Sequence, residues 1–144
     1  MASLLKAHPA NASEKLAQCM QFLAFDYGEK RTGVAVGNRL TQSATPQKTI
    51  AAVGDERWRL VAALVQEWQP QALVVGVPFH PDGAPHENTD RAQKFARQLH
   101  GRYGLPVFEV DERYTSTEAH ALGAKDADAG AACLILEQFL RSDK

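Results

Sequence analysis

Two short apolar runs joined by a glycine turn, with one carboxylate at the end of the first, constrain the fold of this chain most. The first run covers residues 22–25 and ends at Asp26, the second covers residues 33–37, and Gly28 lies in the turn. Runs of this length with a short connection predict two adjacent antiparallel strands. A carboxylate at the mouth of a buried strand adds little to a core, but it can hold a divalent cation beside a phosphate.

Length and composition place the chain among globular proteins with one domain. Its 144 residues are 44% hydrophobic and 23% charged, with a formal net charge of −1. The two cysteines, Cys19 and Cys133, have no zinc-type spacing, which favours a reducing compartment. No run approaches the ~20 apolar residues of a membrane span, so we expect a cytoplasmic protein without a membrane partner. We divide the chain into a flexible N-terminal arm over residues 1–20 and a single domain over residues 21–144.

The order of the expected elements is three strands followed by alternating helices and strands, βββαβαβα. Pro46 in the third strand predicts an edge or a bulge. Short connections favour an antiparallel meander for the first three strands, and the whole pattern predicts an α/β fold with a mixed five-stranded sheet and helices on both faces. The expected strands are residues 21–27, 33–37, 41–50, 72–77 and 105–110, and the expected helices are residues 55–69, 88–100 and 128–141.

Three acidic segments lie at the ends of expected elements. Asp26 and the pair Asp111 and Glu112 follow apolar strands, at the edge where open α/β sheets bind ligands. Asp128, with Asp126 beside it, opens the Ala-rich closing helix. Each segment also has a purely structural interpretation, as a turn-opening Asp, a surface ion-pair cluster with the arginine that follows, or a helix N-cap.

If the acids serve one site, their carboxyl groups must converge. We expect those of Asp26, Glu112 and Asp128 to lie within about 8 Å of one another, a spacing that carboxylates sharing Mg²⁺ through waters can span. Crowded carboxylates repel one another, so at least one should have a raised pKa.

Basic residues and histidines offer further candidate contacts. Lys30 and Arg31 follow the first acid in the turn, while Arg91 and Lys94 recur at a spacing of three on one expected helix. Most such stripes are solvated helix faces, but this one would also suit a phosphate backbone. His80 and His86 share the loop at 78–86 without an acidic partner at helical spacing, so we interpret them as exposed loop histidines rather than metal ligands.

With these residues identified, the chain resembles the YqgF family, also called RuvX, which are Holliday-junction-resolvase-like nucleases of the RNase H superfamily. The resemblance covers about residues 21–141, and the RNase H core has the same βββαβαβα order. Two departures from the family pattern are Gly130 and the loop between Pro78 and Gly83. Four motifs in order carry the resemblance: Asp26-x-Gly28 with Thr32-Gly33-Val34-Ala35, Val74-Val75-Gly76-Val77-Pro78 with Asp82-Gly83, Asp111-Glu112-Arg113-Tyr114-Thr115 with Glu118-Ala119, and Asp128-x-x-Ala131-Ala132 with Ile135-Leu136.

The resemblance implies a metal-dependent nuclease with an RNase H-like fold. Its catalytic residues and ligands of Mg²⁺, with Mn²⁺ as a substitute, would be Asp26, Glu112 and Asp128. The implied substrate is RNA, in maturation of the 5′ end of pre-16S ribosomal RNA on the ribosome precursor. We assign substrate contacts to the basic residues Lys30, Arg31, Arg113, Arg91 and Lys94.

Several alternatives stay open on the sequence. A DNA resolvase would need a dimer to cut two strands, whereas the sequence indicates no dimer surface and we expect a monomer or weak dimer. A catalytically silent RNA-binding factor in ribosome assembly is a second alternative. An ATP-binding module like half of an actin-type fold is disfavoured, because one small domain has no second lobe to enclose a nucleotide. Asp111 or Asp126 could replace one of the named acids.

Overall fold

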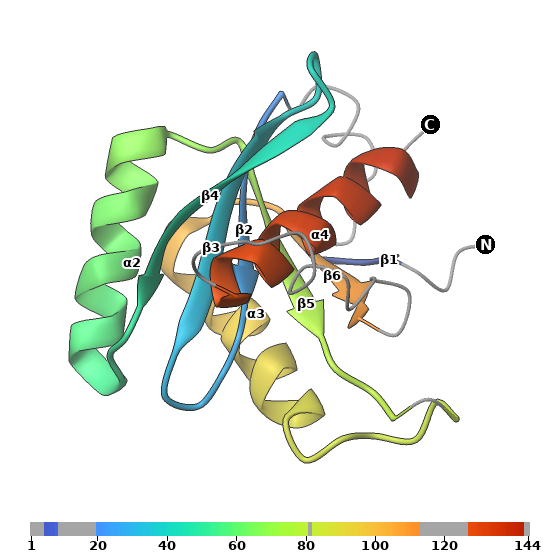
Figure 1. The fold of residues 1–144 in the computed structure, drawn as a ribbon. Coiled ribbons are helices and arrows are strands. Elements are labelled where there is room, and N and C mark those ends of the chain that lie inside the picture. The colour runs from blue at the N-terminus through green and yellow to red at the C-terminus, as the bar shows by residue number, and fades with distance from the viewer. Residues whose placement is uncertain (1–4, 9–19, 81, 113–126, 143–144) are drawn as a thin grey trace.

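The first strands form the expected antiparallel meander at one side of a mixed sheet (Figure 1). The computed structural model describes residues 5–8, 20–80, 82–112 and 127–142. Its sheet has six strands in the order β1-β6-β5-β2-β3-β4. The elements in chain order are β1 (Leu5–His8), β2 (Gln21–Asp26), β3 (Thr32–Asn38), β4 (Ser43–Ile50), α2 (Gly54–Trp68), β5 (Ala72–Val77), α3 (Thr89–Tyr103), β6 (Val107–Asp111) and α4 (Ala127–Ser142).

Two sequence-based expectations about the elements need correction. Leu5–His8, inside the expected flexible arm, forms β1 and pairs antiparallel with β6, which makes a sixth strand. Helix α3 continues past Gly101 to Tyr103, and Gly104 ends it with a φ of 66°. That left-handed conformation favours glycine, whereas Gly101 takes an ordinary helical one. The five expected strands, the three helices and the edge position of Pro46 in β4 are confirmed.

The sheet register brings three strand ends to one edge. Asp26 at the end of β2 pairs with Gly76 of β5 in parallel register, and Gly76 pairs with Val110 of β6. On its other side, Asp26 pairs with Gly33 of β3. The carboxyl ends of β2, β5 and β6 therefore lie side by side, although the sequence separates them widely.

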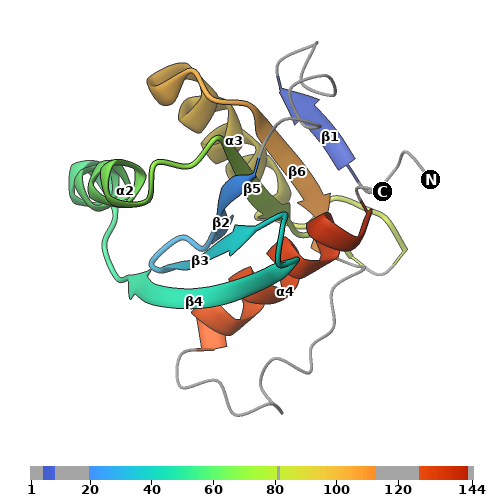
Figure 2. The same cartoon turned by 90° about the horizontal axis from the view of Figure 1, so that it is seen from above.

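Helices cover both faces of the sheet, as expected. Figure 2 shows α4 on one face and α2 and α3 on the other. Phe22 and Phe139 meet edge to face on the α4 side, with ring centroids 5.2 Å apart, and Phe25 and Phe95 do so on the opposite side at 5.6 Å. Successive strand residues alternate between two buried clusters, so odd and even positions of β2 serve different helices. Within the described residues, no helix has both the length and the apolar content needed to cross a membrane.

Leu136 of α4 offers a test of this packing, because its side chain is fully buried whereas that of Leu40 is 80% exposed. Leu136→Ala should lower the free energy of unfolding by about 2–5 kcal/mol, since it leaves a cavity against the sheet. Leu40→Ala removes the same atoms from the surface and should cost less than about 0.5 kcal/mol. Urea denaturation of both variants measures the difference, and equal losses would contradict the placement of α4.

Candidate active site

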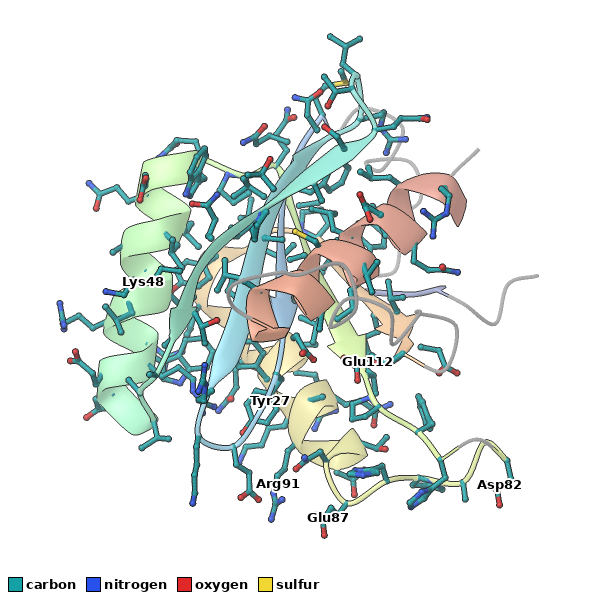
Figure 3. The ribbon with its side chains drawn as sticks, viewed as in Figure 1. Tyr27, Lys48, Asp82, Glu87, Arg91 and Glu112 are labelled. Carbon is teal, nitrogen blue, oxygen red and sulfur yellow. The ribbon has the colours of Figure 1, made fainter. Side chains whose placement is uncertain are left out.

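Two of the three predicted acids meet at the carboxyl edge of the sheet. Asp26 ends β2, and Glu112 follows directly after β6, with β5 between the two strands. The side chains of Asp26 and Glu112 are hydrogen-bonded to each other. Figure 3 shows Glu112 beside the end of β5. The predicted convergence is therefore confirmed for this pair.

Strand alternation explains why both carboxyl groups lie on the α4 face. Phe22 and Ala24 belong to the cluster packed under α4, so Asp26, two residues further along β2, projects to the same face. On β5, a methyl group added to Gly76 would lie 2.8 Å from Oε1 of Glu112 and 2.3 Å from Cδ1 of Ile135. The Glu112 carboxyl group therefore occupies the space that a side chain at Gly76 would fill.

Gly76 is a residue of this candidate site whose role the sequence analysis missed. The signal was present, since a glycine inside the continuous apolar run of β5 weakens a strand unless another group must come close to the backbone. Here the close group is the carboxyl group of Glu112, together with the packed end of Ile135. The glycine thus sets the depth at which Glu112 sits in the site.

The environment of Glu112 strongly favours its neutral form. Burial is the largest of the causes that together raise the pKa of the Glu112 carboxyl to about 10, and the hydrogen bond to Asp26 and the charges of Asp26 and Asp111 act in the same direction. Glu112 therefore carries a proton at neutral pH and donates a hydrogen bond to Asp26. The expectation that at least one pKa is raised is confirmed, although burial is a larger cause than the crowding of carboxylates.

The third acid lies partly outside the described residues. The backbone of Asp128 is in the first turn of α4, the helix that covers the Asp26 face, while Asp126 and Arg113 lie outside the described residues. Ala129 and Ala132 are buried, so the small residues of this turn let α4 sit against the sheet as expected. The position of the Asp128 carboxyl group stays a prediction.

No group of three His, Cys, Asp or Glu side chains arranged to hold a metal occurs among residues 5–8, 20–80, 82–112 and 127–142. The rings of His80 and His86 lie 5.0 Å apart, and Nδ1 of His86 accepts a hydrogen bond from the backbone N–H of Asn88. The loop histidines thus form a local pair without a third ligand in the described part of the chain. Asp128 is the predicted third ligand of a metal site at Asp26 and Glu112.

Arg57 fixes the turn that follows Asp26. Its guanidinium is buried and donates to the backbone oxygens of Ala52 at 3.0 Å and Gly28 at 2.9 Å, and also to that of Glu29. It also lies over the ring of Tyr27, with Cζ 4.9 Å from the centroid. The sequence analysis missed this role, although a charged residue four positions before Val61 on the apolar face of α2 was a signal for it.

A pocket of about 470 Å³ lies beside this turn, between α2 and α3. It brings together three of the predicted substrate-binding residues, whereas Arg31 is exposed on the turn and is not among the lining residues. Tyr27 packs with the α2 and α3 cluster, so the pocket lies on the sheet face opposite Asp26. The lining residues are Tyr27, Glu29, Lys30, Gly54, Arg57, Trp58, Arg91, Lys94, Phe95 and Gln98.

Comparisons with known proteins agree with this fold. Residues 20–142 match the model of a family described as "RuvX: Holliday junction resolvase". A Polaromonas sp. protein is 70% identical over 84% of this chain and 88% of its own, and a Paraburkholderia phymatum protein is 55% identical over 82% and 83%. Both bear the name "Putative pre-16S rRNA nuclease". The fold is similar to that of T. thermophilus RuvC in complex with a Holliday junction substrate, with a TM-score of 0.56, 16% identity, and coverage of 85% of this chain and 94% of that one.

The raised pKa of Glu112 predicts a pH-dependent stability. Between its ordinary value of 4.5 and about 10, the folded protein holds a proton that the unfolded chain has released, so the free energy of unfolding falls as pH rises. In a metal chelator, Glu112→Gln should flatten this fall and raise the melting temperature above that of the wild type near pH 8. Melting curves from about pH 6 to about pH 9 test this. The exposed-site control Glu67→Gln should keep the wild-type slope, and equal slopes for all three proteins would contradict the assignment.

The glycine under Glu112 supplies a second test. Gly76→Ala should lower the free energy of unfolding by about 1–3 kcal/mol, because the new methyl group displaces Glu112 and Ile135. Gly101→Ala, made in open space on α3, should instead raise it by up to about 1 kcal/mol, through better helix propensity. Chemical denaturation gives both values, and a Gly76 variant as stable as the wild type would refute the close approach.

Proposed function

Because the chain belongs to the RuvX family, we propose that it is a nuclease that hydrolyses a phosphodiester bond at the 5′ end of pre-16S ribosomal RNA. The observation that carries the proposal is the contact between the carboxyl groups of Asp26 and Glu112 at the carboxyl edge of the sheet. The names of the relatives support RNA as the substrate. We further propose that the protein acts on the cytoplasmic ribosome precursor as a monomer or weak dimer.

The donor set at this edge fits a hard divalent cation. It consists of carboxyl oxygens, which Mg²⁺ and Mn²⁺ prefer, and Mg²⁺ usually needs only one or two protein carboxylates beside substrate phosphate. We propose that Asp26 and Glu112 hold Mg²⁺, or Mn²⁺, and that Asp128 completes the set. When bound, such an ion supplies Lewis-acid polarisation of a phosphoryl oxygen.

The proton between Asp26 and Glu112, here called the acid pair, affects both metal binding and substrate binding. Asp26 accepts a hydrogen bond from the protonated Glu112 carboxyl group, so the pair without a cation carries one proton on two carboxyl groups. A cation ligand must be deprotonated, so Mg²⁺ bound at Asp26 and Glu112 would require loss of that proton, and metal affinity would rise with pH. Without the cation, the remaining negative charge repels the substrate phosphate. The pair therefore makes substrate engagement depend on the metal.

The basic residues near the edge supply the opposite charge. Lys30 and Arg31 follow Asp26 on the turn that Arg57 holds in place, and we propose that they steady the phosphates beside the scissile bond. Arg91 and Lys94 extend this contact along α3, and Arg113 would add to it next to Glu112. Each such contact releases counterions from the nucleic acid, so binding should weaken with salt.

Asp26→Asn tests the chemical role of the acid pair. It keeps the size of the side chain but removes the charge, so cleavage of a pre-16S ribosomal RNA substrate should fall by at least about a hundredfold. Mg²⁺ should raise the melting temperature of the wild type more than that of the variant. RNA affinity should persist or rise, because the repulsion is gone. Asp82→Asn, at an exposed carboxylate of the 78–86 loop, is the control and should behave as wild type.

Three outcomes separate the proposed nuclease from its alternatives. Wild type that binds RNA but cuts neither ribosomal RNA precursor nor junction DNA, with Mg²⁺ or Mn²⁺, is a silent binding factor. Wild type that cuts only junction DNA is a resolvase. Full cleavage by Asp26→Asn would remove the acid pair from the chemistry altogether.

A further inference from the structure

We propose that the pocket between α2 and α3 binds a backbone phosphate of the RNA strand, and that Glu29 competes with this phosphate for Arg91. The inference rests on the proposed function for the identity of the strand. It adds a second contact point, on the sheet face opposite the acid pair, and assigns a role to a carboxylate that the cleavage chemistry does not use.

The charge of the pocket favours an anion. Four cationic side chains line it against the single carboxylate of Glu29, and the cations are Lys30, Arg57, Arg91 and Lys94. Arg57 is committed to backbone oxygens of the turn, and Lys30 is assigned to the phosphates beside the scissile bond, so Arg91 and Lys94 remain to meet a ligand in the pocket. Such a cluster of arginine and lysine suits a phosphate better than any neutral group.

The aromatic residues of the pocket argue against recognition of a base. Trp58 packs on Phe95 with centroids 5.2 Å apart and has Cζ of Arg102 4.0 Å from its own ring centroid. Tyr27 packs on Phe95 at 5.1 Å and has Arg57 over its ring. Because protein groups already pack on these rings, a base has little ring surface on which to stack. The pocket should therefore bind the backbone regardless of sequence.

Without RNA, the Glu29 carboxylate occupies the place beside Arg91 where we propose that a phosphate binds. Its carboxylate forms an ion pair with the Arg91 guanidinium, which also donates to Oδ1 of Asn88 at 3.0 Å. Both side chains of the pair are about half exposed, at 51% and 49%. Exposed ion pairs are weak, so a strand held by several phosphates can displace Glu29, whereas an isolated phosphate has no such help. Glu29 thus favours long anions over small ones.

The pocket lies close enough to the acid pair to receive the same strand. Asp26 and Tyr27 are consecutive residues, with Cα atoms about 3.8 Å apart, and their side chains project to opposite faces. In Figure 3, Tyr27, Arg91 and Glu112 all lie at the lower end of the sheet. A strand with one phosphate at the acid pair would cross the edge of the sheet and place a nearby phosphate in the pocket.

The test measures binding of fluorescently labelled oligouridylate and oligoadenylate to the full chain in an Asp26→Asn background, where the strand is not cut. Glu29→Gln should tighten binding about threefold, because Arg91 is released. Arg91→Ala and Lys94→Ala should each weaken it about fivefold and make the salt slope shallower by about 0.7, the value for one single-strand phosphate contact. Both RNAs should show the same ratios. The matched controls are Glu67→Gln and Arg97→Ala, since neither residue is among those lining the pocket.

Several results would overturn the proposal. If the Glu29→Gln variant binds RNA no more tightly than the Glu67→Gln control, Glu29 does not compete with the RNA for Arg91. If the Arg91→Ala variant binds RNA no more weakly than the Arg97→Ala control, Arg91 does not contact a phosphate. Inorganic phosphate that displaces the RNA at equal concentration would make the pocket a site for free phosphate instead. A cleavage assay on proteins that keep Asp26 separates the proposal of the phosphate pocket from the proposal of nuclease activity. Cleavage with binding indifferent to Glu29 and Arg91 refutes the pocket alone, whereas the expected binding changes without cleavage support the pocket and refute the nuclease.

Discussion

The contact between the carboxyl groups of Asp26 and Glu112 is the interaction on which the rest of the site depends. Two acids meet where burial, their hydrogen bond and the neighbouring charges together raise the pKa of one of them to about 10, so at neutral pH a proton lies between them. The sheet makes this unfavourable arrangement possible. Register fixes Asp26 opposite Gly76, and Gly76 opposite Val110, so the ends of three strands are held together by backbone pairing rather than by the side chains. The hydrophobic clusters on both faces then stabilise what the acids alone would destabilise.

Local pattern predicts most of this architecture. The apolar runs at β2, β3 and β5 and the helical spacing of α2 and α3 are encoded within each segment, so the meander and the order of elements follow from the sequence. The pairing of Asp26 with Glu112 was also predictable, because strand ends at the carboxyl edge of an α/β sheet converge whatever their separation in the chain. β1 was not, because Leu5–His8 is a mixed tetrapeptide that becomes a strand only by pairing with the edge of β6.

The features that could not be predicted from the sequence depend on contacts between distant segments of the chain. Arg57 resembles any charged residue of an amphipathic helix until three backbone oxygens of a distant turn surround it. The ends of α3 show the same limit, since Gly101 and Gly104 are equally good candidates to stop a helix and only the left-handed φ of Gly104 decides between them. Likewise, Glu29 and Arg91 lie far apart in sequence, and their ion pair exists because the fixed turn and α3 meet beside one pocket.

A chain with a net charge of −1 can engage a polyanion if its charges are sorted by face rather than by number. The acidic and cationic faces separate at Asp26 and Tyr27, because these two consecutive side chains project to opposite faces of the sheet. On the α4 face the acid pair brings negative charge to the edge of the sheet, whereas on the opposite face four cationic side chains and a single carboxylate line the pocket. Strand alternation places these surfaces one residue apart, so the proposed RNA strand would meet the cationic pocket and the acid pair in succession as it crosses the edge. In the proposed function, affinity comes from the cationic face and control of the reaction from the acidic one, and neither role is visible in the overall composition.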